Sequence, residues 1–173
     1  GAFLLPITAA TACTLVRLIV SMHTGPITGW SLENLSLLWG FLFWIFFWCA
    51  MPRPIRTYVL GHELTHALWG VVLGAKLTQI KVGKKGGQVT LTRSNVLITL
   101  APYFFPFYTV LVVVAFEICS IFFDPGPYTP FWMALIGFTW GFHFTFTFST
   151  LATHQSVIET YGRLFSYTLI LWL

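Results

Sequence analysis

One apolar stretch, residues 57–75, constrains the fold of the whole chain because it carries two histidines and a glutamate. The sequence there includes His62-Glu63-Leu64-Thr65-His66. In a helix, positions 62 and 66 lie one turn apart on the same face. This is the H-E-x-x-H pattern, in which two imidazoles bind one zinc ion and the neighbouring carboxylate handles the proton of a water molecule. We therefore predict a helix over residues 57–75, with His62 and His66 as metal ligands and Glu63 as the general base.

The composition predicts that this helix belongs to an integral membrane protein. Of the 173 residues, 57% are hydrophobic and only 8% are charged, whereas a soluble domain carries about 25% charged residues. So few polar side chains could not cover a globular surface. The net charge of +4 comes from basic residues scattered over loops, which excludes the basic face of a nucleic-acid-binding protein. Ionisable groups are costly inside a bilayer and usually functional there, so the membrane context favours chemistry at the motif.

Apolar runs and their breakers predict an all-α polytopic fold with about six transmembrane helices. We expect one transmembrane domain over residues 1–173, with a β-hairpin between the third and fourth spans. The hairpin, residues 77–92, is indicated by two alternating, β-branched segments on either side of a Gly-rich turn. The expected spans are residues 4–22, 33–51, 57–75, 95–123, 130–151 and 163–173, with the fourth kinked by proline and the last cut short by the end of the sequence.

The basic residues predict which side of the membrane each loop faces. If the helices alternate in direction, loops 23–34, 76–94 and 152–163 share one side. That side carries Lys76, Lys81, Lys84, Lys85, Arg93 and Arg163, against Arg53 and Arg56 on the other. The positive-inside rule then places the hairpin in the cytoplasm and the N-terminus outside.

Three features taken together point to a known family. They are the motif within a membrane helix, the turn Gly86-Gly87-Gln88-Val89, and Leu100-Ala101-Pro102 after the hairpin. From Gly61 to about Gly162 the chain resembles the site-2 protease family of intramembrane zinc metalloproteases, which has a Gly-Gly-Tyr-Val turn and a Gly-Pro at the corresponding places. The Asn that follows the family's Gly-Pro is missing here, and Tyr103 and Phe104 stand near its place.

The resemblance implies a function and a set of partners. The expected activity is hydrolysis of a peptide bond within or near a transmembrane helix of a substrate protein, with Zn²⁺ as cofactor. Residues 86–89 of the hairpin would bind that substrate as an added strand. The expected location is a multi-pass protein in a bacterial inner membrane or an equivalent membrane.

The third metal ligand of the family has no clear counterpart in this chain. A catalytic zinc site usually has three protein ligands, and the family supplies the third as the Asp of a Leu-Asp-Gly motif. That Asp aligns near Val157, which cannot bind a metal. Glu159 and His154 are the nearest substitutes, and His143 is possible if its helix lies deeper against the site.

This gap keeps a second hypothesis open. The chain could be a catalytically inactive, protease-like structural or regulatory subunit of a larger membrane protein complex, because two ligands alone would bind zinc weakly. At the motif itself, the alternatives to a metal site are interhelical hydrogen bonds or a haem held by one of the histidines. The presence of Glu63 favours the protease, since a purely structural descendant has no need for a base.

Overall fold

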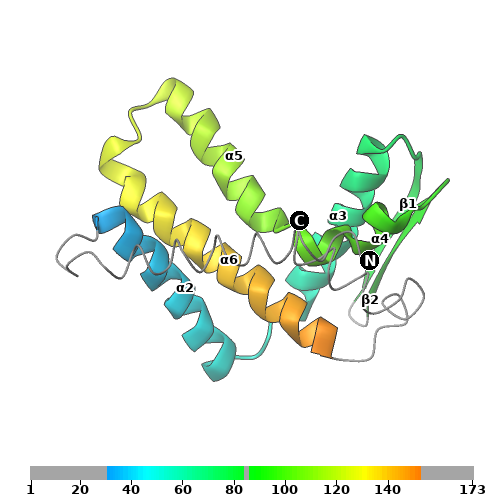
Figure 1. Cartoon of the computed structure of the whole chain (residues 1–173), viewed down its shortest axis with the longest axis horizontal. Coiled ribbons are helices and arrows are strands. Elements are labelled where there is room, and N and C mark those ends of the chain that lie inside the picture. The colour runs from blue at the N-terminus through cyan, green and yellow to red at the C-terminus, as the bar shows by residue number, and fades with distance from the viewer. Residues whose placement is uncertain (1–30, 84–85, 153–173) are drawn as a thin grey trace, which may run out of the picture. The chain divides into compact units, whose positions relative to one another are not determined.

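The computed structural model describes residues 31–83 and 86–152, and the structural statements below concern that part of the chain. Its elements in chain order are α2 (Leu32–Ala50), α3 (Ile55–Val72), β1 (Leu77–Gly83), β2 (Gly86–Leu91), α4 (Val96–Phe104), α5 (Phe107–Phe122), the short 3-10 helix η2 (Gly126–Tyr128) and α6 (Thr129–Ala152) (Figure 1). The spans expected at residues 4–22 and 163–173 lie outside the described residues. The single domain expected over residues 1–173 stays a prediction.

The motif helix α3 ends in a hydrogen-bonded turn that leads the chain into the hairpin. Gly74 adopts a φ of 77°, in the left-handed region that favours glycine after a helix. Its amide donates to the Val71 carbonyl at 2.9 Å, and the Ala75 amide donates to the Gly70 carbonyl at 2.8 Å. These bonds satisfy carbonyl groups that the end of a helix leaves without partners. The chain can therefore reverse at once, and β1 begins beside the helix that it follows.

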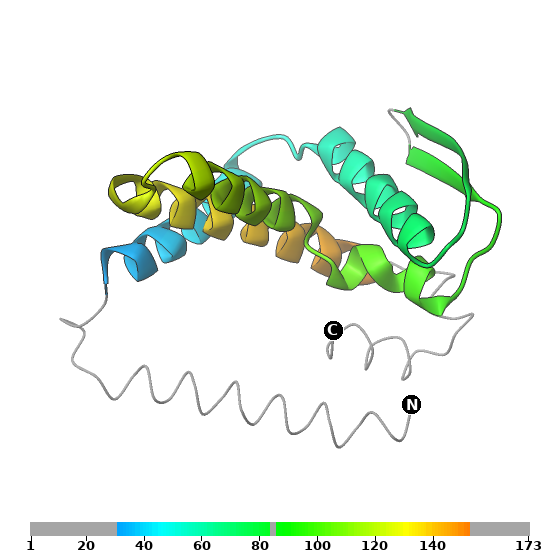
Figure 2. The same cartoon turned by 90° about the horizontal axis from the view of Figure 1, so that it is seen from above.

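The strands β1 and β2 form an antiparallel hairpin that packs along α3. The register pairs Gly83 with Gly86 at the turn and Leu77 with Leu91 at the open end. Leu91 fills the space over Gly70, where an added β-carbon would lie 2.6 Å from Leu91 Cδ1. Both views of the chain show the two strands beside α3 (Figures 1 and 2). The hairpin therefore forms within the predicted residues 77–92, and its partner is the motif helix.

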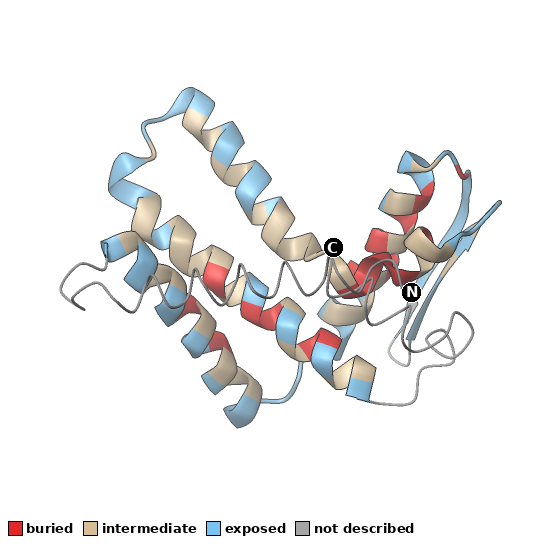
Figure 3. Ribbon diagram, in the orientation of Figure 1, coloured by how far each residue is buried: buried red, intermediate tan, exposed pale blue. Residues whose placement is uncertain are grey.

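The kink expected within residues 95–123 is a sharp bend between two separate helices. Asn95 begins α4, and its side chain accepts a hydrogen bond from the Ile98 amide at 2.9 Å. Pro106 lacks an amide hydrogen and restricts the residue before it, so α4 ends at Phe104 and α5 leaves at 73°. The bend keeps α4 against α3, and Figure 3 shows buried residues gathered on these two helices.

A second close contact joins α2 to α6. Glycines let the two backbones approach, because a β-carbon at Gly40 would collide with the carbonyl of Ala134, and one at Gly137 with the carbonyl of Leu37. Aromatic side chains pack between the same two helices. The buried members of that cluster are Trp44, Phe142 and Phe146. This helix pair brings the second half of α6 towards the start of α3, where Tyr58 stacks on Phe146.

The prediction of about six membrane-spanning helices is wrong for the described part of the chain. There, α2 alone is long and apolar enough to cross a membrane, and α4 with α5 would add a second span if the bent pair counts as one. The motif helix α3 falls short because it contains an arginine, two histidines and a glutamate. Similarly, α6 falls short because threonine, tryptophan and histidine dilute its apolar residues. One helix of this kind, α2, indicates association with a membrane.

Candidate functional site

The two motif histidines lie one turn apart on α3, as the spacing predicts. The ring centroids of His62 and His66 are 4.9 Å apart, and the rings are nearly perpendicular at 81°. The Nδ1 atom of His66 lies 2.8 Å from the carbonyl oxygen of Ile98 on α4. A carbonyl can only accept, so Nδ1 carries the proton and Nε2 keeps its lone pair. Metal-binding histidines usually have this arrangement, with one ring nitrogen donating to the protein.

The ring of His62 is oriented by a tyrosine on the preceding turn. The hydroxyl of Tyr58 lies 3.3 Å from His62 Nδ1 and 3.0 Å from Thr150 Oγ1 on α6. A phenol can donate or accept, so this contact serves either tautomer of the imidazole. Tyr58 is itself held by Phe146, with ring centroids 4.5 Å apart and planes within 5°. The Nδ1 atoms of both histidines therefore have partners, which leaves both Nε2 atoms for a ligand.

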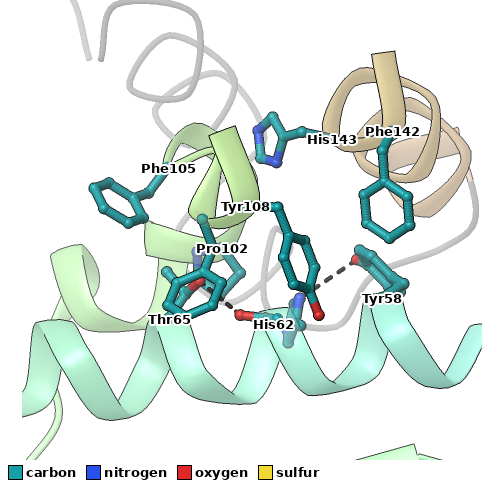
Figure 4. Close-up of a pocket in the computed structure, with 10 residues that line it drawn as sticks. Tyr58, His62, Thr65, Pro102, Phe105, Tyr108, Phe142 and His143 are labelled. Atoms are coloured by element: carbon teal, nitrogen blue, oxygen red, sulfur yellow. Dashed lines mark hydrogen bonds between the residues drawn. The ribbon is translucent and has the colours of Figure 1, made fainter. Parts of the chain in front are cut away.

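A small cavity lies beside His62 (Figure 4). Its volume is about 20 Å³, which is enough for about one water molecule. The polar side chains that line it are Tyr58, His62, Thr65, Tyr108 and His143. His143 comes from α6, and its ring lies near the backbone carbonyl of Tyr103. The structure therefore brings His143 to the same cavity as His62.

The third member of the motif, Glu63, faces the hairpin. Its side chain is only 8% exposed. A β-carbon added to Gly87 would lie 2.8 Å from both Cδ and Oε1 of Glu63. The backbone amide of Val89 faces the same carboxyl group. Strand β2 therefore covers the carboxylate of the motif.

A groove of about 350 Å³ runs beside β2 and reaches His66. Residues of β2 and the beginning of α4 form its walls. Gln88 and Val89, two of the four residues expected to bind substrate, line this groove, whereas Gly86 and Gly87 do not. A groove next to the edge of a sheet can accept an extended peptide.

The described residues do not assemble a complete metal site. Within residues 31–83 and 86–152, no group of three His, Cys, Asp or Glu side chains could hold a metal ion together. His143 reaches the cavity beside His62, but the three histidines form no such group. Glu159 and His154, the other candidates for the third ligand, lie outside the described residues. The identity of the third ligand stays a prediction.

Two of the contacts that orient the histidines were not predicted from the sequence. Tyr58 stands four residues before His62, and that helical spacing was the available signal. The Ile98 carbonyl is 32 residues from His66, and no local pattern links them. Tyr103, near the place of the family's Asn, has its ring 5.7 Å from that of His62.

Comparisons with known proteins found no relative of this chain. No family model matches the sequence, and neither a curated protein nor a solved structure does. The resemblance to site-2 proteases therefore stays a hypothesis that depends on the motif and its surroundings.

Proposed function

We propose that this protein is an intramembrane zinc metalloprotease of the site-2 type, which hydrolyses a peptide bond within or near a transmembrane helix of a substrate protein. One observation carries the proposal. His62 and His66 lie on one face of α3 with both Nδ1 atoms engaged, and Glu63 stands between them in the chain. Protein zinc sites use imidazole nitrogen as a ligand and prefer rings held in this way.

His62 and His66 supply two of the three protein ligands that a catalytic zinc site usually has. We propose that the third comes from Glu159 or His154, which follow α6. His143 is the weaker candidate, because it forms no metal-binding group with the motif histidines in the described part of the chain. A bound zinc ion would supply Lewis acidity, which polarises a peptide carbonyl and activates water at neutral pH.

Each residue of the site then has a task in peptide hydrolysis. His62 and His66 hold the ion, while Tyr58 and the Ile98 carbonyl keep their rings oriented. Water attacks the peptide carbonyl carbon. Glu63 takes the proton from that water and passes it to the amine that leaves when the C–N bond breaks. The groove beside β2 would hold the substrate as an extended strand.

We propose that α3 lies within the bilayer despite the ionisable residues of its motif, and the charges at its two ends support an orientation. Lys76, Lys81 and Arg93 lie beyond its C-terminal end, against Arg53 and Arg56 near its N-terminal end. By the positive-inside rule we propose that the hairpin is cytoplasmic and the N-terminus is outside. The cytoplasm would then supply water to the site. The proposed location is a bacterial inner membrane or an equivalent one, crossed more than once.

The incomplete donor group in the described residues favours one alternative. In that alternative the chain is an inactive, protease-like structural or regulatory subunit of a membrane complex. It would bind zinc weakly, because two ligands leave the ion poorly held. The two proposals therefore differ in metal content and in the need for Glu63.

Metal analysis of the purified chain is the first test. We expect about one zinc ion per chain, lost in both His62→Ala and His66→Ala and retained in His23→Ala, which changes a histidine outside the motif. Less than about half an equivalent of zinc in the wild type would refute the proposal, because a catalytic ion must be retained. Zinc content that is unaffected by His66→Ala would refute it as well.

The second test separates the protease from the inactive subunit. Wild type and Glu63→Gln are each co-expressed with a membrane protein that has a single transmembrane helix. The protease proposal expects cleavage by the wild type alone, with equal zinc in both. If zinc is present and the two chains do not differ in cleavage, the inactive subunit is the better description.

A further inference from the structure

Strand β2 touches the motif helix at two places, and one of them is the motif carboxylate. Leu91 covers Gly70, and Gly87 covers Glu63. These contacts are four residues apart on the strand and seven apart on the helix, which correspond to about 13 Å and about 10 Å. The two lengths are comparable, so β2 runs along one face of α3 and its two ends are held by different contacts.

The contact with Glu63 explains why residue 87 is a glycine. Its neighbour Gly86 has a φ of 151° and serves the turn, whereas Gly87 does not have a positive φ. Any residue could therefore adopt the backbone conformation at position 87. The space beside residue 87 has no room for a side chain, because a β-carbon there would lie 2.8 Å from Glu63 Cδ and Oε1. Glycine is needed here to leave room for the carboxyl group.

The amide of Val89 is the second backbone group of β2 that lies close to the Glu63 carboxylate. A buried carboxylate is costly unless a hydrogen-bond donor faces it, and Glu63 is 8% exposed with the Val89 amide facing it. Both contacts come from the backbone of β2. The position of the carboxylate is therefore determined by where the strand lies and not by the side chains that the strand carries.

We propose that β2 is the positioning element of the general base, in which the bare backbone of Gly87, with the amide of Val89 beside it, holds the Glu63 carboxylate in one orientation. This inference rests on the proposed function, because it takes Glu63 as the base. It assigns Gly87 and Val89 a role different from the substrate binding that the resemblance implied. Gln88 and Val89 both line the groove with His66, so both keep the substrate-binding role, and Val89 has the two tasks together.

Reaction with dicyclohexylcarbodiimide, an apolar reagent that modifies carboxyl groups, tests the positioning directly. Purified wild type, Gly87→Ala and Gly83→Ala are treated in detergent, and modification of Glu63 is measured by peptide mass spectrometry. Gly83→Ala is the matched control, because its β-carbon would meet only the Gly86 carbonyl oxygen at 3.4 Å. Glu63→Gln gives the background, and exposed Glu117 is the internal reference.

We expect Glu63 to be modified several-fold faster in Gly87→Ala than in wild type, with Gly83→Ala and the rate at Glu117 unchanged. Equal rates at Glu63 in wild type and folded Gly87→Ala would overturn the inference. The measurement needs neither metal nor substrate. A chain without zinc that still shows the expected labelling would refute the proposed function and leave the contact between β2 and Glu63 in place.

A rescue experiment covers the case in which Gly87→Ala folds poorly. If the added methyl group displaces Glu63, removing that side chain should restore the space. We expect Gly87→Ala to lower Tm by about 3 °C or more in the wild-type background and by less than about 1 °C in the Glu63→Ala background. Equal shifts in the two backgrounds would mean that the residues do not interact, and the inference would fail.

Discussion

The backbone of Gly87 lies against the side chain of Glu63, with no room between them for a β-carbon. This relationship joins the motif helix and the hairpin into one site. The same strand that covers the carboxylate also borders the groove that reaches His66. A displacement of β2 would therefore change both the shape of this groove and the orientation of the Glu63 carboxylate.

Replacing Tyr58 by phenylalanine tests the contact that orients His62. The hydroxyl lies 3.3 Å from His62 Nδ1, and loss of such a partner lowers metal affinity by about 10- to 100-fold. We expect Tyr58→Phe to weaken zinc binding by that amount, as measured by competition with a chelator. Tyr128→Phe is the control, because Tyr128 is 66% exposed on η2 and does not line the cavity beside His62. Equal affinities for wild type and Tyr58→Phe would remove Tyr58 from the site.

Alanine substitution at the three remaining candidates identifies the third ligand. We expect Glu159→Ala or His154→Ala to lose zinc and His143→Ala to retain it, because the described residues form no three-membered donor group. Zinc per chain is measured for each variant under identical conditions. Loss of zinc in His143→Ala alone would contradict the prediction and would show that α6 supplies the ligand.

Removal of the cap on α4 should weaken both the helix and the metal site. The Asn95 side chain accepts from the Ile98 amide at 2.9 Å, and the Ile98 carbonyl accepts from His66. We expect Asn95→Ala to lower the free energy of unfolding by about 1 kcal/mol, and Asn95→Asp to keep it near the wild-type value. Unfolding in detergent measures the first effect, and zinc affinity measures the second. An Asn95→Ala chain as stable as the wild type would show that the cap contributes nothing.

The crossing of α2 and α6 should depend on its glycines. A β-carbon at Gly40 would collide with the Ala134 carbonyl, and a backbone cannot move aside as a flexible side chain can. We expect Gly40→Ala to cost about 1–3 kcal/mol of stability. Gly83→Ala, which meets the Gly86 carbonyl oxygen at ordinary van der Waals distance, is the control in thermal unfolding. Similar Tm values for these two variants would argue against close packing at this crossing.

Local patterns predicted the positions of the elements well, because apolar runs, prolines and glycines act on nearby residues. The helix expected over 57–75 is α3, and the hairpin expected over 77–92 forms there. The number of membrane spans was wrong in the described part of the chain. The aromatic and polar residues that fill α6, and the charged motif in α3, make those helices less apolar than their length suggested.

By itself, the sequence determined that His62 and His66 share one face of a helix, since a period of 3.6 residues leaves no other arrangement. It did not determine what each motif side chain meets. The Ile98 carbonyl reaches His66, and Gly87 reaches Glu63, through the bend after α4 and the reversal at Gly74. Such contacts join segments far apart in the chain, and their distances depend on how the elements pack. For that reason only the tertiary structure decided which residues orient the candidate ligands and which strand covers the proposed base.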